Sequence, residues 1–457
     1  MVYLILSSLL LAISFQYPAL NLAAFFAFIP FLINIKFKNK TQAFINFFLL
    51  GLIFNLITII WLTKVTILGY IVLAIYLSLY FGIFGLFYYF ISNKIILSFL
   101  WVFLEISREY IFTGFPWLPL GSSQYANILV LQLVSIIGAY GLSGIIIYSN
   151  LLLADLFKTK FKTNNIQLAV FSSILSFAII FGYFRINNNL EIKNPTADNI
   201  LKVGIINTNV PLSIKWNPKL KEANVKKYID LSFKMQDEKC DLIIWPETGI
   251  PGYLQKNNLF LRNVTATADI LDTHLLVGSQ EYKINPDQSK KYFNTMFFIT
   301  PEGKITQEYD KVKLVALGEY LPLKKIFPFL KHFYMGDVEF SKGDSYTKFS
   351  IKNFNFSSVI CFEDIFTSLI KKFAKTGLDF LVVASNDAWF YRNEANQHLI
   401  MSILRAVEFG IPVLRSSNIG ISCVIDRFGH IPFKQTDRDG YIVTELVKLE
   451  SFSGTFY

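Results

Sequence analysis

Long runs of uncharged, apolar residues fill roughly the first 190 positions and constrain the fold more than any other feature of the sequence. A helix that spans a bilayer needs about 20 predominantly apolar residues. Seven runs approach or exceed that length, at residues 2–16, 18–34, 42–62, 66–91, 96–112, 127–155 and 166–184. The N-terminal part of the chain is therefore predicted to form a multi-span α-helical membrane bundle.

The first two runs are short and are separated only by Gln16-Tyr17-Pro18, so a tight helical hairpin is expected there. A cleaved signal peptide is the alternative interpretation of the first run. That run lacks a basic region before it and a clear small-residue cleavage site after it, and further spans follow. These features favour a retained first helix.

Lysines in the short loops after the second, fourth and sixth runs predict the orientation of the bundle. They are Lys36, Lys38 and Lys40, then Lys94, then Lys158, Lys160 and Lys162. Basic residues in short loops stay on the cytoplasmic side of a membrane. The N-terminus is therefore predicted to be cytoplasmic, and the part of the chain after residue 190 is predicted to lie outside the cytoplasm.

The net charge of +10 does not indicate a nucleic-acid-binding protein. Many of the lysines lie in the predicted cytoplasmic loops, and the sequence shows no clustered basic recognition helix. Attraction to anionic lipid headgroups explains the charge better. Membrane lipids are therefore expected partners, and nucleic acid is not.

The sulfur and imidazole side chains indicate neither a disulfide framework nor a metal site. The three cysteines are Cys240, Cys361 and Cys423. They are too few for a disulfide framework, although one pair could form a disulfide. The four histidines are scattered, and no HExxH or CxxC pattern occurs. No metal and no cofactor are expected.

Glu105 and Arg108 lie one helical turn apart near the end of the fifth apolar run, where they can pair along one face. Charged side chains in a membrane region are costly unless they are paired or face an aqueous cavity, which makes both residues functional candidates. An interfacial pair that only anchors the helix is an equally good interpretation.

The second half of the chain reads as an α/β domain. After a polar linker at residues 187–199, near-continuous apolar runs alternate with helical patterns up to about residue 450. We therefore predict a membrane domain of about seven transmembrane helices at 1–186, the linker at 187–199 and an extracytoplasmic domain at 200–450, followed by a short stub at 451–457.

Polar residues follow several of the apolar runs in this second half. WPET places Glu247 just beyond one run, SSVICFED places Cys361 at the end of another, and YDKVKLVALGEYLPL supplies Lys311 and Glu319. In open α/β sheets, ligands bind in the crevice beyond the strand ends. Each position alone is a weak signal, because a lone cysteine at a strand end is more often buried structure than a nucleophile.

Glu363 and Asp364 follow Cys361 almost at once, and nearby negative charge disfavours a thiolate. If Lys311 lies beside Cys361, its charge offsets these carboxylates and stabilises both the thiolate and a later oxyanion. If Glu247 is also close, it can take the thiol proton as a general base. The sequence thus leads to the hypothesis that the side chains of Cys361, Lys311 and Glu247 lie close together.

Several motifs resemble a known family. WPET, YDKVKL with GEYLPL, and CFED, in the order Glu, Lys, Cys, look like the nitrilase superfamily triad. FTGFPWLPLGSSQ, IGAYGLS, SIKW, SNDAWF and LRAVEFGIPVLRSSNIG extend the resemblance over both halves to the apolipoprotein N-acyltransferase family. The resemblance implies a nitrilase-like αββα sandwich on a multi-span membrane bundle. It also implies a bacterial inner-membrane protein whose catalytic domain is periplasmic.

The resemblance further implies a two-step acyl transfer. A fatty acyl chain passes from a phospholipid, with phosphatidylethanolamine as the expected donor, to a thiol. The resulting thioester then acylates the N-terminal amine of a diacylglyceryl-cysteine lipoprotein. Matched residue by residue, Cys361 is the nucleophile, Glu247 the base and Lys311 the stabiliser of the oxyanion. The positions that match the family's further site residues are Glu319, Glu363, Phe362 and Trp216.

The segment LPLKKIFPFLKHF at residues 321–333 mixes lysines with bulky apolar residues, as segments in the headgroup region of a membrane do. A lid that touches the membrane is expected there, and a surface loop packed on the domain's own core is the alternative. The expected lipid-contact residues are Lys324, Lys325, Phe327 and Phe329, with Trp389 and Phe390 from a second loop.

Three departures from the family pattern bear on function. Phe362 stands where the family usually has tyrosine, LVALGE replaces LVPFGE, and SGTFY at the end stands where a further transmembrane helix is expected. One alternative is therefore a membrane-tethered amidase or nitrilase, and another is a catalytically disabled lipid- or lipoprotein-binding remnant. The full set of membrane motifs disfavours the first, and the presence of Glu247, Lys311 and Cys361 disfavours the second.

Overall fold

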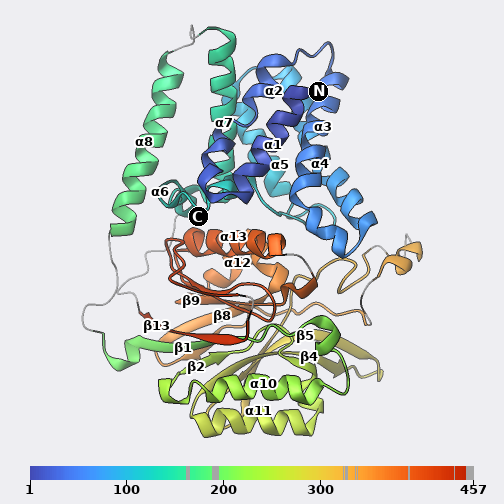
Figure 1. Cartoon of the computed structure of the whole chain (residues 1–457), viewed down its shortest axis with the longest axis vertical. Coiled ribbons are helices and arrows are strands. Elements are labelled where there is room, and N and C mark those ends of the chain that lie inside the picture. The colour runs from blue at the N-terminus through green and yellow to red at the C-terminus, as the bar shows by residue number, and fades with distance from the viewer. Residues whose placement is uncertain are drawn as a thin grey trace. The chain divides into compact units, whose positions relative to one another are not determined.

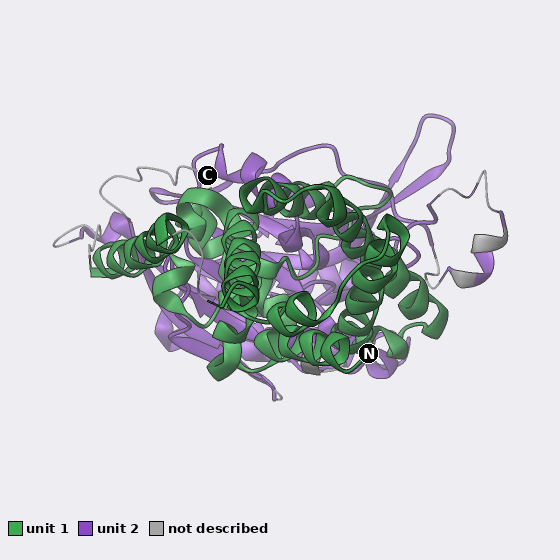
Figure 2. Cartoon of the chain, turned by 90° about the horizontal axis from the view of Figure 1, so that it is seen from above, with its two compact units in different colours: residues 1–189, 396–410, 454–457 green, residues 190–395, 411–453 purple. Residues whose placement is uncertain are grey.

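The chain forms two compact units, shown in different colours in Figure 2. The computed structural model describes residues 1–160, 165–187, 195–322, 324, 328–334, 336, 338–389, 392–436 and 438–448. Unit 1 contains the described residues of 1–189 and 396–410, and unit 2 contains those of 190–395 and 411–453. Each unit is described by itself below.

Unit 1 is helical (Figure 1). Its α-helices are α1 (Val2–Gln16), α2 (Ile29–Asn34), α3 (Lys40–Thr58), α4 (Ile67–Phe90), α5 (Lys94–Ser107), α6 (Ile128–Leu131), α7 (Val134–Lys158) and α8 (Asn165–Asn187), and its 3-10 helices are η1 (Pro18–Phe25), η2 (Ile60–Lys64) and η3 (Leu120–Gln124). Among the described residues, α3, α4, α7 and α8 are long and apolar enough to cross a membrane. A multi-span helical bundle is thus confirmed.

The other predicted spans are either interrupted or shorter than these four helices. The run at 18–34 is not one helix, because η1 and α2 divide it. Pro18 begins η1 and a second proline lies at the start of α2, and proline is tolerated only in the first turn of a helix. The 15 residues of α1 reach only about 22 Å at 1.5 Å per residue, less than the thickness of a hydrocarbon core. With 14 residues, α5 is shorter still.

Close packing joins α3 and α4. A Cβ at Gly85 would lie 2.6 Å from the Cβ of Phe47, so only glycine lets the Phe47 ring seat against α4. The same relation holds in reverse, since a Cβ at Gly51 would lie 2.6 Å from the ring of Phe81. Small residues at such contacts drive helix association where water is absent.

Helix α13 (Arg392–Phe409) belongs to unit 1 from residue 396 onward. The Gln397 side-chain oxygen accepts hydrogen bonds from the indole nitrogens of Trp61, at 3.0 Å, and Trp117, at 2.8 Å. Its amide nitrogen donates to the Thr58 carbonyl at 2.8 Å. At the other end of α13, Glu408 accepts from the Ala139 N–H at 2.9 Å, next to the kink that Gly138 makes in α7.

Unit 2 contains two sheets. The first has the order β13-β1-β2-β4-β5-β6, with β3 beside β4, and the second has the order β12-β11-β10-β9-β8-β7. The strands of the first sheet are β1 (Ile200–Asn207), β2 (Leu242–Ile244), β3 (Ile250–Tyr253), β4 (His274–Ile284), β5 (Lys290–Ile299), β6 (Ile305–Asp310) and β13 (Gly440–Val447). Those of the second are β7 (Phe349–Ile351), β8 (Phe354–Ile360), β9 (Phe380–Ser385), β10 (Val413–Ser417), β11 (Ser422–Ile425) and β12 (Phe433–Gln435).

Parallel pairing in the centre of both sheets matches the predicted alternation of strands and helices. Strands β1, β2 and β4 are parallel, as are β8, β9 and β10. The connecting helices include α9 (Leu212–Lys215), α10 (Lys221–Phe233), α11 (Asn258–Leu271) and α12 (Thr367–Ala374). In Figure 1, α10 and α11 cover one face of the first sheet. The predicted α/β class is confirmed.

The core between α10, α11 and the first sheet explains why the apolar runs form these elements. Tyr228 of α10 stacks on Trp245 with ring centroids 5.2 Å apart, and Val264 of α11 and Phe297 of β5 join the same buried cluster. The Trp245 indole nitrogen donates to the Ser232 hydroxyl at 3.1 Å. The one polar atom of the buried indole ring is therefore satisfied.

Asn418 joins the two sheets through buried hydrogen bonds. Its side-chain oxygen accepts from the Thr208 hydroxyl at 2.8 Å and from the Val210 N–H at 3.0 Å. Its amide nitrogen donates to the Val210 carbonyl at 2.8 Å and to the Asn386 side chain at 3.0 Å. Asn418 follows β10 and Thr208 follows β1, so one fully buried amide ties the ends of strands from both sheets.

Replacing Asn418 by alanine should destabilise unit 2 strongly. Leaving buried partners unsatisfied costs about 1–3 kcal/mol, so we expect a loss near the top of that range, about 3 kcal/mol. That loss lowers the thermal midpoint by about 6–12 °C for a domain of this size. Thermal unfolding of the detergent-solubilised protein measures it. Asn353→Ala, at an exposed asparagine, is the control and should leave the midpoint unchanged. Equal midpoints for the two variants would contradict the role given to Asn418.

Candidate active site

Cys361 lies directly after strand β8, as the first residue of a 3-10 helix, Cys361–Ile365. Its backbone has φ 52°, in the left-handed region that residues other than glycine rarely adopt. Strained positions of this kind concentrate at functional sites. The residue is partly exposed, whereas Cys240 and Cys423 are buried free thiols.

Glu247 lies beyond the end of β2 and is buried. Its backbone passes so close to β4 that a Cβ at Gly278 would lie 2.9 Å from the Glu247 Cα and 2.4 Å from the Pro246 carbonyl oxygen. The side-chain amide of Asn294 donates to Glu247 Oε1 at 2.8 Å. Burial raises the pKa of the Glu247 carboxyl above its usual value, although Lys311 lowers it. A carboxyl with a raised pKa suits a general base.

Lys311 follows β6 and only 1% of its side chain is exposed. Its Nζ lies 2.9 Å from Glu319 Oε1 and 3.8 Å from Glu247 Oε1. Burial alone would lower the pKa of Lys311, but the Glu319 and Glu247 carboxylates raise it above its ordinary value. Lys311 is therefore a fixed positive charge at neutral pH.

The Cys361 thiol is protonated at rest. Burial and the Glu247 carboxylate hold its pKa well above the usual range, while Lys311 acts in the opposite direction. A nucleophilic thiol with such a pKa must lose its proton to a base during the reaction, because the thiolate is the reactive form. Glu247 therefore interacts electrostatically with the thiol.

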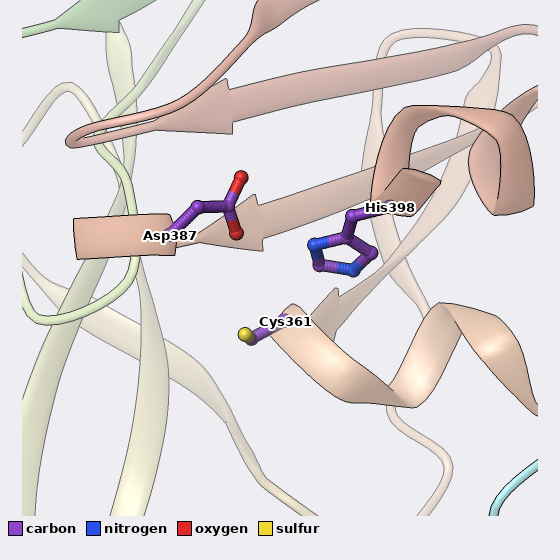
Figure 3. Close-up of side chains that lie close together, drawn as sticks. All are labelled: Cys361, Asp387 and His398. Carbon is purple, nitrogen blue, oxygen red and sulfur yellow. The ribbon is translucent and has the colours of Figure 1, made fainter. Parts of the chain in front are cut away.

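Asp387 lies at the same edge of the second sheet as Cys361 (Figure 3). The thiol sulfur and an Asp387 carboxylate oxygen are within 4.8 Å of each other. Asp387 also lies 3.5 Å from the Arg415 guanidinium, which it shares with Asp364. The third side chain drawn in Figure 3, His398, belongs to unit 1.

Glu363, one of the two acidic residues after Cys361, holds the site together instead of repelling the thiolate. It is fully buried and its carboxylate accepts hydrogen bonds of 2.8 Å from three backbone N–H groups. Burial raises its pKa to about 7. The donors are the N–H groups of Ile360, Val312 and Lys313, together with the Tyr309 hydroxyl.

Asp364, the second acidic residue, pairs with a buried arginine that also lies near Asp387. Arg415 in β10 lies 3.2 Å from the Asp364 carboxylate, and both side chains are fully buried. Our hypothesis from the sequence used Lys311 alone to offset Glu363 and Asp364. The structure adds hydrogen-bond donors for Glu363 and an arginine for Asp364, while Lys311 lowers the pKa of Glu363 and interacts most strongly with Glu319 and Glu247.

Asn294 is a site residue that sequence reasoning missed. It lies within β5, and its amide nitrogen donates both to Glu247 at 2.8 Å and to Glu319 at 3.2 Å. Its backbone carbonyl accepts from the Lys311 N–H at 2.8 Å. An asparagine inside an apolar strand was the available signal, since such residues are depleted from strands.

The other predicted site residues of unit 2 lie around this cluster. Glu319 accepts a further hydrogen bond from the Val315 N–H at 2.8 Å. Phe362 packs perpendicular to Phe366 with ring centroids 5.2 Å apart. Trp216 follows α9 directly and is partly exposed. The structure therefore brings Glu319 into hydrogen-bonding distance of Lys311.

Glu105 and Arg108, the candidates of unit 1, are buried and lie 3.8 Å apart. Glu105 accepts from the Trp101 indole at 2.9 Å and from the Leu120 N–H at 2.8 Å. Both side chains line a small cavity with apolar neighbours such as Trp101. Burial inside the unit disfavours the interpretation as a purely interfacial anchor.

The predicted lipid-contact residues fall largely outside the described part of the chain. Lys324 is exposed and pairs with Glu339 at 2.8 Å. The lipid contact of the segment at 321–333 remains a prediction. The predicted residues that lie outside the described ones are Lys325, Phe327 and Phe390, and also the side chains of Phe329 and Trp389.

Two protein-family descriptions match the two halves of the chain. "Apolipoprotein N-acyltransferase N-terminal domain" matches residues 7–152, and "Carbon-nitrogen hydrolase" matches residues 204–450. Among solved structures, Saccharomyces cerevisiae Nit3, a member of branch 10 of the nitrilase superfamily, aligns with a TM-score of 0.44 and 18% identity. That alignment covers 57% of this chain and 92% of the yeast protein.

Curated relatives carry the same family name. The apolipoprotein N-acyltransferase of Geobacter metallireducens is 32% identical over 455 residues, which cover 93% of this chain and 85% of the relative. That of Rickettsia prowazekii is 33% identical over 343 residues, which cover 74% of this chain and 66% of the relative. The chain therefore belongs to the apolipoprotein N-acyltransferase family, with a carbon-nitrogen hydrolase domain after its membrane helices.

Proposed function

We propose that this chain transfers a fatty acyl group from a phospholipid to the N-terminal amine of a diacylglyceryl-cysteine lipoprotein, through a thioester at Cys361. One observation carries the proposal. A partly exposed thiol interacts electrostatically with a buried carboxyl of raised pKa and with a buried lysine, and these two groups lie 3.8 Å apart. These groups form a complete set for acyl transfer without a cofactor.

The first half-reaction forms the thioester. Glu247 takes the Cys361 proton as the sulfur attacks the ester carbonyl of the phospholipid, and Lys311 stabilises the negative oxygen of the tetrahedral intermediate. The intermediate then expels the lysophospholipid hydroxyl, which receives the proton from Glu247. One C–S bond forms and one C–O bond breaks.

The second half-reaction uses the same groups. The lipoprotein amine attacks the thioester carbonyl and gives its proton to Glu247, while Lys311 again stabilises the oxyanion. The Cys361 sulfur leaves and is reprotonated, so an amide forms and the free thiol returns. The raised pKa of Glu247 suits a group that accepts and returns a proton in each half-reaction.

The membrane helices support a reaction that takes place at a membrane. Four of the described helices are long and apolar enough to span a bilayer, and both substrates carry acyl chains that stay in a membrane. The lysine distribution supports a cytoplasmic N-terminus and a periplasmic catalytic domain in the inner membrane. Phosphatidylethanolamine is the expected donor. The amidase and remnant alternatives are not favoured, because the family membership extends over both halves.

Incubation with phosphatidylethanolamine should add one fatty acyl chain to the wild-type protein. Intact mass spectrometry of the detergent-solubilised protein measures the gain, and hydroxylamine should remove it because a thioester is labile to this nucleophile. Cys361→Ala should show no gain, and Cys423→Ala, at a buried thiol, should acylate normally. A folded wild-type protein that gains no acyl mass from the lipid would refute the proposal.

Replacing Asn294 by aspartate should reduce acyl transfer about a hundredfold, near the lower limit of what general-base catalysis contributes. The change converts a donor shared by Glu247 and Glu319 into a third carboxylate, which raises the pKa of Glu247 further. Transfer to a synthetic diacylated lipopeptide measures the rate. Asn353→Asp, at an exposed position, is the control. An unchanged rate of acyl transfer for Asn294→Asp would show that Asn294 does not contribute to catalysis.

A further inference from the structure

Lys215 is a buried lysine that the mechanism above does not use. It is the last residue of α9, and only 2% of it is exposed. Its Nζ donates a hydrogen bond of 3.1 Å to the backbone carbonyl of Glu247. Lysine is almost never fully buried without a partner. The partner here is the backbone of the proposed general base.

The backbone on both sides of this hydrogen bond is fixed. The Asn224 side chain, from α10, donates to the Ile214 carbonyl at 3.1 Å and to the Lys215 carbonyl at 3.4 Å, which anchors α9. On the other side, Thr248 has φ 48°, a left-handed conformation that needs support from its surroundings. Lys215 therefore bridges an anchored helix and a strained segment that carries Glu247.

The charges of Lys215 and Glu247 act on each other. Burial lowers the pKa of Lys215 to about 7, while the Glu247 carboxylate opposes that shift. In return, Lys215 lowers the pKa of Glu247, as Lys311 does more strongly, and Glu319 raises it. Cys361 also interacts electrostatically with Glu247. Lys215 keeps an N–H donor in both protonation states, but it carries positive charge mainly below about pH 7.

We propose that Lys215 is a positioning residue for the general base: it fixes the backbone of Glu247 through a hydrogen bond and places a positive charge beside the carboxyl. The inference rests on the proposed role of Glu247 as the base. Its consequence is that the acidic limit of thiol activation depends on Lys215. Without the Lys215 charge, Glu247 holds its proton to a higher pH and cannot accept one from Cys361.

The test is the pH dependence of Cys361 alkylation by iodoacetamide in the full-length, detergent-solubilised protein. Mass spectrometry of the Cys361 peptide follows the rate from about pH 5 to about pH 9, a range that spans the ordinary histidine and cysteine pKa values. This reaction needs base-assisted loss of the thiol proton but no lipid. It therefore separates Lys215 from the acyl-transfer activity.

Lys215→Met should move the acidic limb of this profile to higher pH by about one unit, so the rate below pH 7 falls about tenfold. Lys227→Met is the matched control. Lys227 also donates to a backbone carbonyl of unit 2, that of Thr208 at 2.8 Å, but does not contact Glu247. Its profile should match that of the wild type. If Lys215→Met does not fold, Lys215→Gln, which keeps a donor without the charge, should show the same shift.

Glu247→Gln distinguishes the two ways in which the experiment can fail. If this variant keeps the wild-type profile, Glu247 is not the base and the mechanism proposed above fails with the inference. If Glu247→Gln loses the acidic limb while Lys215→Met keeps the wild-type profile, only the inference is overturned. A lowered thermal midpoint of Lys215→Met with an unchanged profile overturns it too, because it shows a purely structural role.

Discussion

One buried carboxylate, that of Glu363, determines the geometry of the site. It accepts a backbone N–H at the end of the strand that presents Cys361 and two more from the segment that follows Lys311. The nucleophile and the cation come from different sheets, so they share an active site only if the strand ends are held in register. Burial disfavours the charged form of Glu363, which shows in its raised pKa, and the hydrogen bonds offset that cost.

The remaining charges follow from this arrangement. Glu363 has N–H donors and Asp364 has Arg415, while Lys311 also lowers the pKa of Glu363. Lys311 is left between Glu247 and Glu319, at 3.8 and 2.9 Å. It can therefore stabilise an oxyanion while Glu247 stays free to move a proton. The acidic residues beside Cys361 are thus compatible with a nucleophilic thiol, although a sequence reading makes them seem unfavourable.

Sequence reasoning found those parts of the fold and site that have a strong local signal. Glu247 and Cys361 each follow an apolar run, and the alternation of runs predicts the α/β domain in which such ends meet. Asn294 and Lys215 escaped it, because an asparagine within a strand and a lysine beside a short helix show their roles only through their distant partners. Hydropathy did not show that η1 and α2 divide the run at 18–34, because it records apolar character and not whether the backbone is one continuous helix.

A base that works in two successive half-reactions needs a pKa between two limits. If the pKa of Glu247 were at its ordinary value, the carboxylate would be too weak a base to take the thiol proton. If burial acted alone, the carboxyl would stay protonated and could not accept the thiol proton. Lys311 opposes burial as a permanent charge, and Lys215 opposes it with a charge that weakens above about pH 7. Two lysines thus set the basicity of Glu247. Lys311 keeps its positive charge near neutral pH, whereas Lys215, which lowers the pKa of Glu247 less, loses its charge there.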